Sequence, residues 1–241
     1  MQTLIPATRP DCQIRRFCIA SAIVLVGYSG FAGDLSGGTS PQDSLRLVLG
    51  DPRFRELKGI PGVKLDLRYA STNNFMHQNV YGEFKRAFLH KEAVIKLTKA
   101  AQLLSVEKPE YQLLVLDALR PRSVQRLFWA KVKGTPQEKY VADPEKGSIH
   151  NFGFAVDLTI VDETGKELDM GTGFDAFLPA AEPRNESKLL QDGELTPAQV
   201  EHRKLLRRCM EKAGFIQLED EWWHYDAKPG KEVRSREKLI E

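Results

Sequence analysis

The sequence predicts an α+β fold with a mainly antiparallel sheet and packed helices. Strand-like and helix-like segments alternate without the regular strand–helix–strand rhythm of a parallel α/β domain. The 241 residues are 41% hydrophobic and 28% charged, a balance typical of a globular domain with a sizeable core. This composition excludes a fully disordered chain, a collagen-like fibre and a small disulfide-stapled domain.

The first 32 residues have the order of a secretory signal peptide. A polar stretch ends in Arg15-Arg16, an apolar run occupies 17–26, and Gly30-Phe31-Ala32 fits a cleavage site with small residues. The apolar run is shorter than the roughly 20 residues that span a bilayer, so we expect no stable membrane span. A buried N-terminal helix is the alternative interpretation. The signal peptide predicts export, to the periplasm.

Beyond the signal segment we expect a flexible linker and one functional domain. Residues 33–44 are rich in Gly, Ser, Asp and Pro, which predicts the linker, and the domain then spans 45–241. The net charge of +2 comes from the signal segment, which holds three arginines and one aspartate. The remaining chain is neutral, so we expect no nucleic-acid partner, because such proteins usually present a basic face. The sequence predicts no particular oligomeric state.

Cysteine usage fits an exported chain without disulfides. Two of the three cysteines lie in the predicted signal peptide, so only Cys209 remains in the mature chain. It lies on the apolar side of a predicted helix. We therefore expect Cys209 to be a small core residue and not a nucleophile.

The first half of the domain contains two predicted helices and a strand between them. Apolar residues at helical spacing predict a helix over 91–104. A compact apolar run predicts a buried strand over 112–116. A second helix is expected over 123–133, with Val124, Leu127 and Phe128 facing inward.

The segment 154–160 is the most informative strand. Apolar side chains alternate along it and point into the core, whereas Asp157 lies on the opposite face with Ala155 and Thr159. The strand would therefore present the Asp157 carboxylate from a rigid support.

A long surface loop and a well-delimited helix follow. Gly, Pro and charged residues predict the loop over 171–195. Thr196 is a predicted N-cap, with Pro197 at the first helical position and a glutamine completing the capping box. The helix is expected to run from Pro197 to Ala213 and to end at Gly214.

Two segments concentrate side chains that can hold a metal ion, 147–157 and 219–225. A catalytic zinc takes three protein ligands and keeps one position for water. His150, Asp157 and His224 would supply that set, and Glu221 would remain near the metal as a general base. The spacing alone also fits a capped strand with a buried hydrogen bond, and the Trp222-Trp223 pair also fits simple packing.

Two further expectations concern the neighbouring residues. Glu221 and His224 are three apart, so they can face one site only if a turn or bulge lies between them. The other histidines lack such surroundings. His77 and His90 lie in polar, loop-like stretches, and His202 lies on a charged helix and should be solvent-exposed.

The ordered motifs resemble a known family. Ser148-x-His150-x-x-Gly153-x-Ala155-x-Asp157, with Glu221-x-x-His224, resembles the zinc D-Ala-D-Ala peptidases of the LAS type, whose fold is hedgehog- or DD-peptidase-like. The run 221–225 narrows the resemblance to the VanX-type D-alanyl-D-alanine dipeptidases. The segments 66–75, 117–121 and 170–175 look like the same subfamily. The resemblance extends over roughly 60–225, with Ala118-Leu119 departing from the expected glycine and aromatic residue.

The resemblance implies zinc-dependent hydrolysis of D-Ala-D-Ala to two D-alanines in cell-wall precursor metabolism. It implies one zinc per chain on His150, Asp157 and His224, with Glu221 as the base and Arg120 stabilising the transition state. The implied substrate-pocket residues are Asp175, Ser148, Tyr69 and Tyr81. A zinc D,D-carboxypeptidase or L,D-peptidase acting on longer peptidoglycan peptides remains the alternative.

Overall fold

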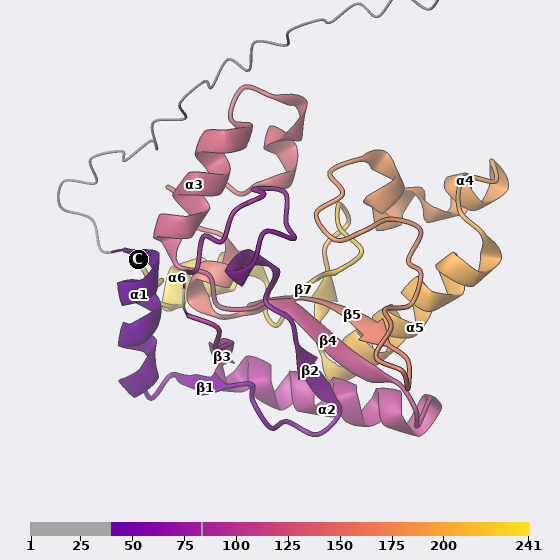
Figure 1. Ribbon diagram of the computed structural model, residues 1–241, viewed down its shortest axis with the longest axis horizontal. Coiled ribbons are helices and arrows are strands. Elements are labelled where there is room, and N and C mark those ends of the chain that lie inside the picture. Colours follow the sequence, from indigo (N-terminus) through magenta and orange to yellow (C-terminus); the bar gives the residue numbers. More distant parts are fainter. Residues whose placement is uncertain (1–39, 83) are drawn as a thin grey trace, which may run out of the picture. The chain divides into compact units, whose positions relative to one another are not determined.

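The computed structural model describes residues 40–82 and 84–241 (Figure 1). The predicted signal peptide, 1–32, and most of the predicted linker lie outside the described residues. Helix α1 (Pro41–Leu47) begins inside the segment that was expected to be a linker. Within the described ranges, no helix combines the length and the apolar character needed to cross a membrane.

A five-stranded sheet forms the centre of the domain, in the order β2-β4-β5-β7-β6. The β2–β4 pair is parallel, and the other three pairs are antiparallel. Strands β1 and β3 form a separate antiparallel pair. The expected α+β class with a mainly antiparallel sheet is confirmed. The strands are β1 (Phe54–Glu56), β2 (Val63–Leu65), β3 (Phe88–His90), β4 (Gln112–Asp117), β5 (Ala155–Val161), β6 (Ile216–Gln217) and β7 (His224–Asp226).

Helices α2 and α5 pack against each other, and their apolar faces join the main hydrophobic core with β4 and β5. In the view of Figure 1, α2 runs below the sheet and α3 stands above it. The α-helices after α1 are α2 (Lys91–Glu107), α3 (Arg122–Val132), α4 (Glu186–Gln191), α5 (Pro197–Ala213) and α6 (Gly230–Arg236). The 3₁₀ turns are η1 (Val48–Gly50), η2 (Arg68–Ala70), η3 (Pro136–Tyr140), η4 (Ile149–Phe152), η5 (Pro179–Ala181) and η6 (Pro183–Asn185).

The predicted helices and strands are present, with shifted ends. The helix expected over 91–104 continues to Glu107, and α5 has the predicted bounds with the capping box in place. In α3 the prediction that Leu127 faces inward is wrong, because this residue is 39% exposed. The buried face of α3 carries Gln125 beside Val124 and Phe128, which turns Leu127 toward solvent.

Strand β5 is buried on both faces. Its apolar residues point into the main core as expected, and Asp157 and Thr159 on the other face are buried as well. Asp157 is therefore presented by a rigid strand into a desolvated site.

The prediction of a long surface loop over 171–195 is wrong in part. The segment contains η5, η6 and α4 and buries residues such as Ala181 and Leu189. Its order comes from distant side chains. The buried guanidinium of Arg203, on α5, donates to the backbone carbonyls of Met170 and Ala180.

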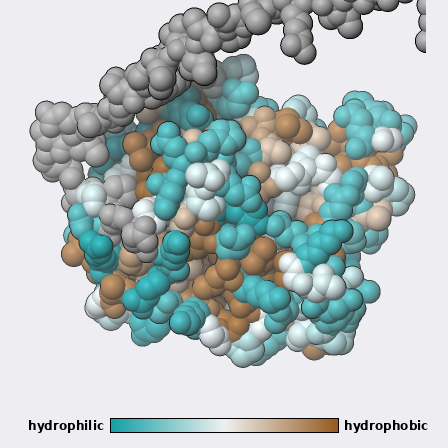
Figure 2. Space-filling view, in the orientation of Figure 1, coloured by the Kyte–Doolittle hydropathy of each residue, from teal (hydrophilic) through white to brown (hydrophobic). Residues whose placement is uncertain are grey.

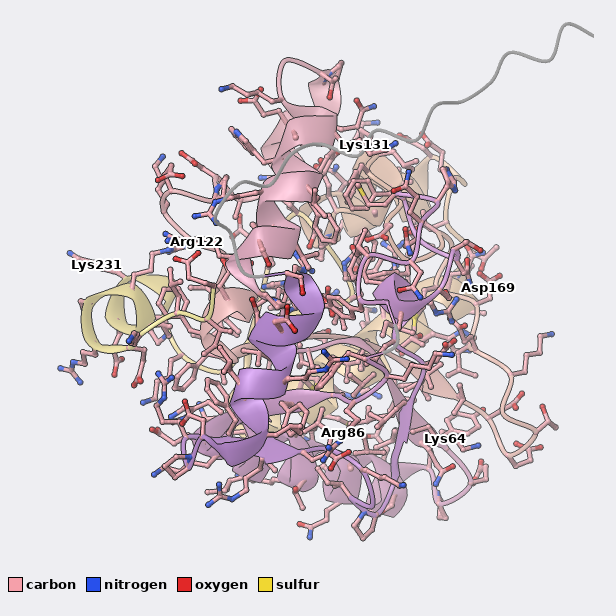
Figure 3. The ribbon with its side chains drawn as sticks, turned by 60° about the vertical axis from the view of Figure 1, so that its left-hand side comes forward. Lys64, Arg86, Arg122, Lys131, Asp169 and Lys231 are labelled. Carbon is pink, nitrogen blue, oxygen red and sulfur yellow. The ribbon has the colours of Figure 1, made fainter. Side chains whose placement is uncertain are left out.

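Charged side chains are dispersed over the surface of the domain. On the face shown in Figure 2, hydrophilic residues are interspersed with apolar ones. The charged residues labelled in Figure 3, among them Lys64, Lys131 and Lys231, project from separate elements. Exposed ion pairs such as Arg46–Asp43 and Lys204–Glu201 place both signs of charge on the described surface.

Candidate active site

His150 lies on the short turn η4, whose geometry is fixed by its own cap. The Ser148 side chain accepts from the His150 backbone N–H, and the Ser148 N–H donates to Asn151 Oδ1 at 2.8 Å. Gly153 then reverses the chain into β5 with a φ of +72°. A Cβ at this position would lie 2.7 Å from a Phe54 ring carbon, so glycine is required there.

His224 and Asp157 come from adjacent strands. They are directly paired in the register of β7 on β5. Glu221 precedes β7, and the His224 N–H donates to the Glu221 carbonyl at 3.4 Å. This bond closes the turn that the spacing of these two residues required, and both side chains line the same cavity.

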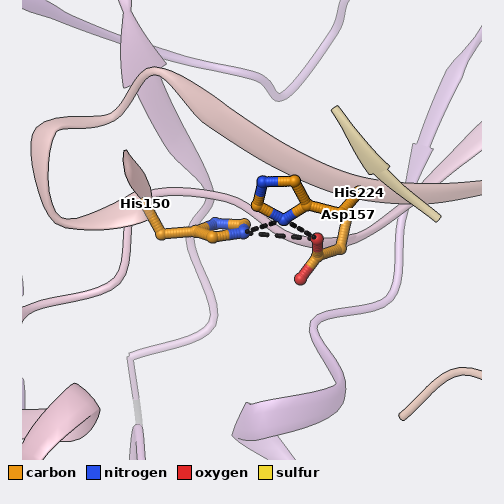
Figure 4. A group of neighbouring side chains, drawn as sticks. All are labelled: His150, Asp157 and His224. Atoms are coloured by element: carbon orange, nitrogen blue, oxygen red, sulfur yellow. Dashed lines mark hydrogen bonds and ion pairs between the residues drawn. The ribbon is translucent and has the colours of Figure 1, made fainter. Parts of the chain in front are cut away.

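Three side-chain atoms converge on one point in the interior (Figure 4). His150 Nε2 lies 3.1 Å from His224 Nδ1 and 3.2 Å from Asp157 Oδ1, and the last two atoms are 3.0 Å apart. The remaining ring nitrogens have other partners. His150 Nδ1 donates to the Ala118 carbonyl at 2.7 Å, and His224 Nε2 lies 3.0 Å from Asp226 Oδ1. The two outer nitrogens are thus engaged by acceptors, which leaves the two facing nitrogens available as ligands for a cation. Burial disfavours a charge on His224, but its hydrogen bonds to Asp157 and Asp226 raise its pKa well above the usual value.

This donor set fits a metal ion. Ligands about 2.0–2.1 Å from a tetrahedral ion are about 3.3 Å apart, close to the separations seen here. All three residues are buried, and their facing nitrogen and oxygen atoms need a cation or a proton between them. Among the described residues, His90, Glu92 and Glu237 also lie within ligand distance of one another. That second group is less suitable, because Lys228 Nζ already lies 2.7 Å from Glu92.

Glu221 has a buried carboxylate beside this cluster. Its Oε2 lies 3.9 Å from His224 Nδ1, and burial raises the pKa of Glu221 to about 8. Within the described part of the chain, no hydrogen bond to this carboxylate is present. Glu221 is thus a carboxyl group that faces the cavity and has no hydrogen-bond partner among the described residues.

Arg120 is held on all sides in the cavity wall. Its Nε and Nη2 donate to Asp117 Oδ2 at 2.9 and 2.7 Å, and its Nη1 donates to Gln125 Oε1 at 2.9 Å. The guanidinium also lies over the rings of Tyr69 and Phe128. Burial disfavours the charge, but Asp117 raises the pKa of Arg120 further above its usual value. The group is therefore a fixed positive charge 3.4 Å from Asp157.

The predicted pocket residues are placed differently from one another. A cavity of about 240 Å³ is lined by the metal-ligand candidates, Glu221 and Arg120 together with Ser148, Tyr69 and Asp175. The Asp175 carboxylate accepts from the Tyr69 hydroxyl at 2.8 Å and from the Phe75 N–H at 3.1 Å. Burial raises the pKa of Asp175 to about 7. Tyr81 is buried behind the wall instead, where its hydroxyl donates to Asp117 at 2.7 Å.

Three neighbours of the site were not found from the sequence. Asp117 and Gln125 hold Arg120, and Asp226 orients His224. Asp226 follows His224 by two residues on a strand, a spacing that could have indicated it. Gln125 gives no such signal, since it occupies an inward position on an otherwise apolar helix face.

The other histidines and the cysteine are outside the cavity. His77 is exposed. His90 is buried at the start of α2, where its ring stacks on Phe154, so the prediction that His90 lies in a polar loop is wrong. His202 is only partly exposed, and its Nδ1 donates to the Asp169 carbonyl. Cys209 is buried in the core as predicted, and burial raises the pKa of its thiol to about 11.

Comparison with known proteins gives the family. Residues 53–237 match the sequence profile of the D-Ala-D-Ala dipeptidases, peptidase family M15. The D-alanyl-D-alanine dipeptidase of Escherichia coli K12 is 34% identical over 69% of this chain and 79% of the relative. The D-alanyl-D-alanine dipeptidase of Enterococcus faecalis is 29% identical over 68% of this chain and 85% of the relative. That of Enterococcus faecium is 30% identical over 69% of this chain and 86% of the relative. The solved structure of the LD-carboxypeptidase LdcB aligns with 77% of this chain and 73% of the LdcB chain, at 20% sequence identity. The TM-score of 0.38 is too low for this likeness to support a statement on fold or substrate. The chain belongs to the D-Ala-D-Ala dipeptidase family of peptidases.

Proposed function

We propose that this chain is a zinc-dependent dipeptidase that hydrolyses D-Ala-D-Ala to two D-alanines in cell-wall precursor metabolism. The observation that carries the proposal is the convergence of His150, Asp157 and His224 in a cavity that also exposes Glu221 and Arg120. Family membership and the names of the relatives supply the substrate. The small cavity fits a short peptide.

The metal would be held by His150 Nε2, His224 Nδ1 and Asp157 Oδ1. Two imidazoles and one carboxylate are a ligand set typical of catalytic zinc with an open position. Zinc bound there would polarise a carbonyl and make a water molecule more acidic. The Ala118 carbonyl and Asp226 would hold the two rings in the tautomers that expose these nitrogens.

Glu221 is proposed as the general base. It accepts the proton of the attacking water and returns it to the leaving amine. Its carboxyl has no other hydrogen-bond partner among the described residues. Burial raises its pKa to about 8, and a zinc ion in the neighbouring site would lower this pKa again and favour the ionised form that accepts a proton.

Arg120 is proposed to stabilise the negative charge that develops on the carbonyl oxygen. Its guanidinium faces the cavity and is held by Asp117 and Gln125, so it needs no reorganisation during the reaction. At a neighbouring position, Asp175 would pair with the substrate ammonium, with Tyr69 fixing the carboxylate. Ser148 also lines the cavity and would contact the substrate.

The assay of choice follows both products and the metal. The zinc-loaded full chain should release two D-alanines from D-Ala-D-Ala, lose this activity with a chelator and regain it with zinc. A pentapeptide ending in D-Ala-D-Ala separates the alternative. Comparable release of D-alanine from the pentapeptide would instead identify a D,D-carboxypeptidase.

We also propose that the chain is exported and that residues 1–32 are removed. The support is the sequence order of that segment, a polar start, a short apolar run and small residues at Gly30-Phe31-Ala32. Mass spectrometry of the periplasmic fraction should find a new N-terminus near Gly33. Intact Met1 on a cytoplasmic protein would contradict this proposal.

A further inference from the structure

The outer edge of the cavity carries a hydrogen-bonded network centred on Glu182, between η5 and η6. Glu182 is only 4% exposed. Its Oε1 accepts from Lys139 Nζ and from the Tyr140 hydroxyl, each at 2.8 Å. Its Oε2 accepts from Arg184 Nε at 3.1 Å and Asn185 Nδ2 at 2.9 Å. Burial opposes ionisation, but the hydrogen bonds from Lys139, Tyr140 and Arg184 lower the pKa of Glu182 to about 2, so it is charged at every working pH.

The network joins three separate segments around the cavity. Lys139 and Tyr140 lie on η3, Glu182 and Arg184 lie in the η5–η6 segment, and Arg184 also pairs with Asp220, directly before Glu221. The side chains of Lys139 and Arg184 are 55% and 44% exposed, so the network lies at the solvent side. Lys139, Tyr140 and Asp220 also line the cavity. We call these five residues, Lys139, Tyr140, Glu182, Arg184 and Asp220, the Glu182 network.

An aromatic layer that begins at Tyr140 extends from this network to the proposed substrate site. The rings of Tyr140 and Phe177 stack at 5.4 Å with an interplanar angle of 11°, and Phe177 contacts Phe75 at 4.9 Å between ring centroids. The Phe75 backbone donates to the Asp175 carboxylate. The aromatic layer is therefore adjacent to the carboxylate that would bind the substrate ammonium.

We propose that the Glu182 network holds Tyr140 and Phe177 closed over the amino-terminal side of the cavity and so restricts the enzyme to free dipeptides. Tyr140 and Phe177 belong to different segments, and the bonds of Glu182 to Lys139 and Tyr140 draw those segments together. A residue added to the substrate's amino group would need the space that the two rings occupy. This inference rests on the proposed function, since it takes Asp175 as the ammonium site.

The test uses two substrates that differ by one residue at the amino end. In the zinc-loaded full chain, kcat/KM is measured for D-Ala-D-Ala and for Gly-D-Ala-D-Ala. In Glu182→Gln we expect the tripeptide-to-dipeptide ratio of kcat/KM to rise by about tenfold or more, the size of a single steric contact in a pocket. Glu107→Gln is the matched control, because it breaks an exposed ion pair with Arg208 far from the cavity lining and should leave the ratio unchanged.

A second variant covers a folding defect in Glu182→Gln, which the melting temperature would reveal. Phe177→Ala removes one ring without touching the ion pairs, and it should raise the same ratio. The proposal is overturned if the folded variants keep the wild-type ratio, or if they lose activity on both substrates equally. In either case the wild-type chain still hydrolyses D-Ala-D-Ala. A wild-type chain that does not hydrolyse D-Ala-D-Ala overturns the proposed function itself, and the inference with it.

Discussion

Glu221 differs from the three metal-ligand candidates in having no partner for its carboxylate among the described residues. His150, Asp157 and His224 hold one another through a shared point, whereas Glu221 only borders it, 3.9 Å from His224. Two carboxylates in one cavity can therefore have different roles, one as a ligand and one as a base. The substitutions that separate these roles act on metal content and turnover independently.

Glu221→Gln should keep zinc and lose turnover. The amide preserves the shape of the side chain but cannot accept the proton of water, and a positioned acid–base group contributes typically 10²–10⁴-fold to the rate. Zinc content, melting temperature and kcat are measured on one preparation. Loss of zinc from this variant would make Glu221 a ligand, and near-normal turnover would remove it from the mechanism.

Asp175→Asn should change the pH dependence of kcat/KM for D-Ala-D-Ala. Burial raises the pKa of Asp175 to about 7, and only the ionised form pairs with an ammonium. In the wild type, the Asp175 ionisation should therefore add a fall in kcat/KM below about pH 7 to the fall caused by protonation of Glu221. The asparagine loses a charged hydrogen bond, which costs about 10- to 100-fold in kcat/KM, and its profile should lack the Asp175 ionisation.

Asp175→Asn should lower kcat/KM but raise the free energy of unfolding at alkaline pH. Because the folded pKa of Asp175 is raised, the folded state keeps a proton that the unfolded state has lost between about pH 4 and 7. Stability from this group is thus present at low pH and is lost as the pH rises through 7. Asp175→Asn should be more stable than wild type at pH 8, by up to about 4 kcal/mol. Asparagine also tolerates the φ of +61° at this position. Urea unfolding at pH 5 and 8 tests this, and an equal difference at both pH values would contradict it.

At the scale of elements, the turn between η4 and β5 positions two metal-ligand candidates at once. His150 precedes Gly153 and Asp157 follows it, so the reversal at this glycine sets the distance between their side chains. The glycine has two separate reasons to be there, its φ of +72° and the close approach of Phe54 and the His90 backbone.

Gly153→Ala should be more destabilising than Gly134→Ala. Both residues have positive φ, but a Cβ at Gly134 meets nothing within 4 Å, so that variant shows the backbone strain alone. We expect about 1 kcal/mol for Gly134→Ala and about 2–4 kcal/mol for Gly153→Ala, because overpacking adds to the strain. Denaturant unfolding of the two variants gives the difference. Equal losses would show that Phe54 moves aside without cost.

Local signals predicted some elements to the residue and missed others. The bounds of α5 follow from Thr196, Pro197 and Gly214, which act on neighbouring backbone groups. The order of 171–195 could not be predicted this way, because Arg203 on α5 and the Trp222 backbone hold its carbonyls from distant positions. The prediction that Leu127 faces inward was wrong because helical spacing alone does not indicate that the polar Gln125 occupies the buried face.

In the site, too, some features could be predicted from local sequence and others depend on tertiary contacts. His150, Asp157, Glu221 and His224 line one cavity, as the resemblance of their motifs led us to expect, whereas their spacing alone left a structural alternative open. Tyr81 was expected in the pocket but lies behind Arg120, because β4 and the segment after η2 meet only in the folded chain. Asp117 lies at the end of β4, and its role in holding Arg120 depends on that same tertiary contact.

At the scale of the whole molecule, the proposed metal site joins segments that are far apart in the sequence. η4, β5 and β7 each supply one ligand candidate, and β5 and β7 are central strands of the main sheet. Three acceptor atoms about 3 Å apart in a buried site repel one another unless a cation or proton lies between them. Bound zinc should therefore stabilise the folded state in addition to its role in catalysis.

Removing zinc should lower the global stability of the domain. A ligand that binds only the folded state adds about 4.1 kcal/mol when its free concentration is 1,000 times its dissociation constant. The free energies of unfolding of the chelated and the zinc-loaded chain, measured with denaturant, should differ by about this amount. The same difference is expected for the catalytically impaired Glu221→Gln. His150→Ala should abolish the difference by removing a ligand. His202→Ala should retain it, because His202 donates to the Asp169 carbonyl and does not line the cavity. An apo chain as stable as the zinc-loaded one would mean that a proton on His224, whose pKa is raised by its hydrogen bonds to Asp157 and Asp226, relieves the repulsion as well as zinc does. The three residues would then be a hydrogen-bonded cluster without a structural metal.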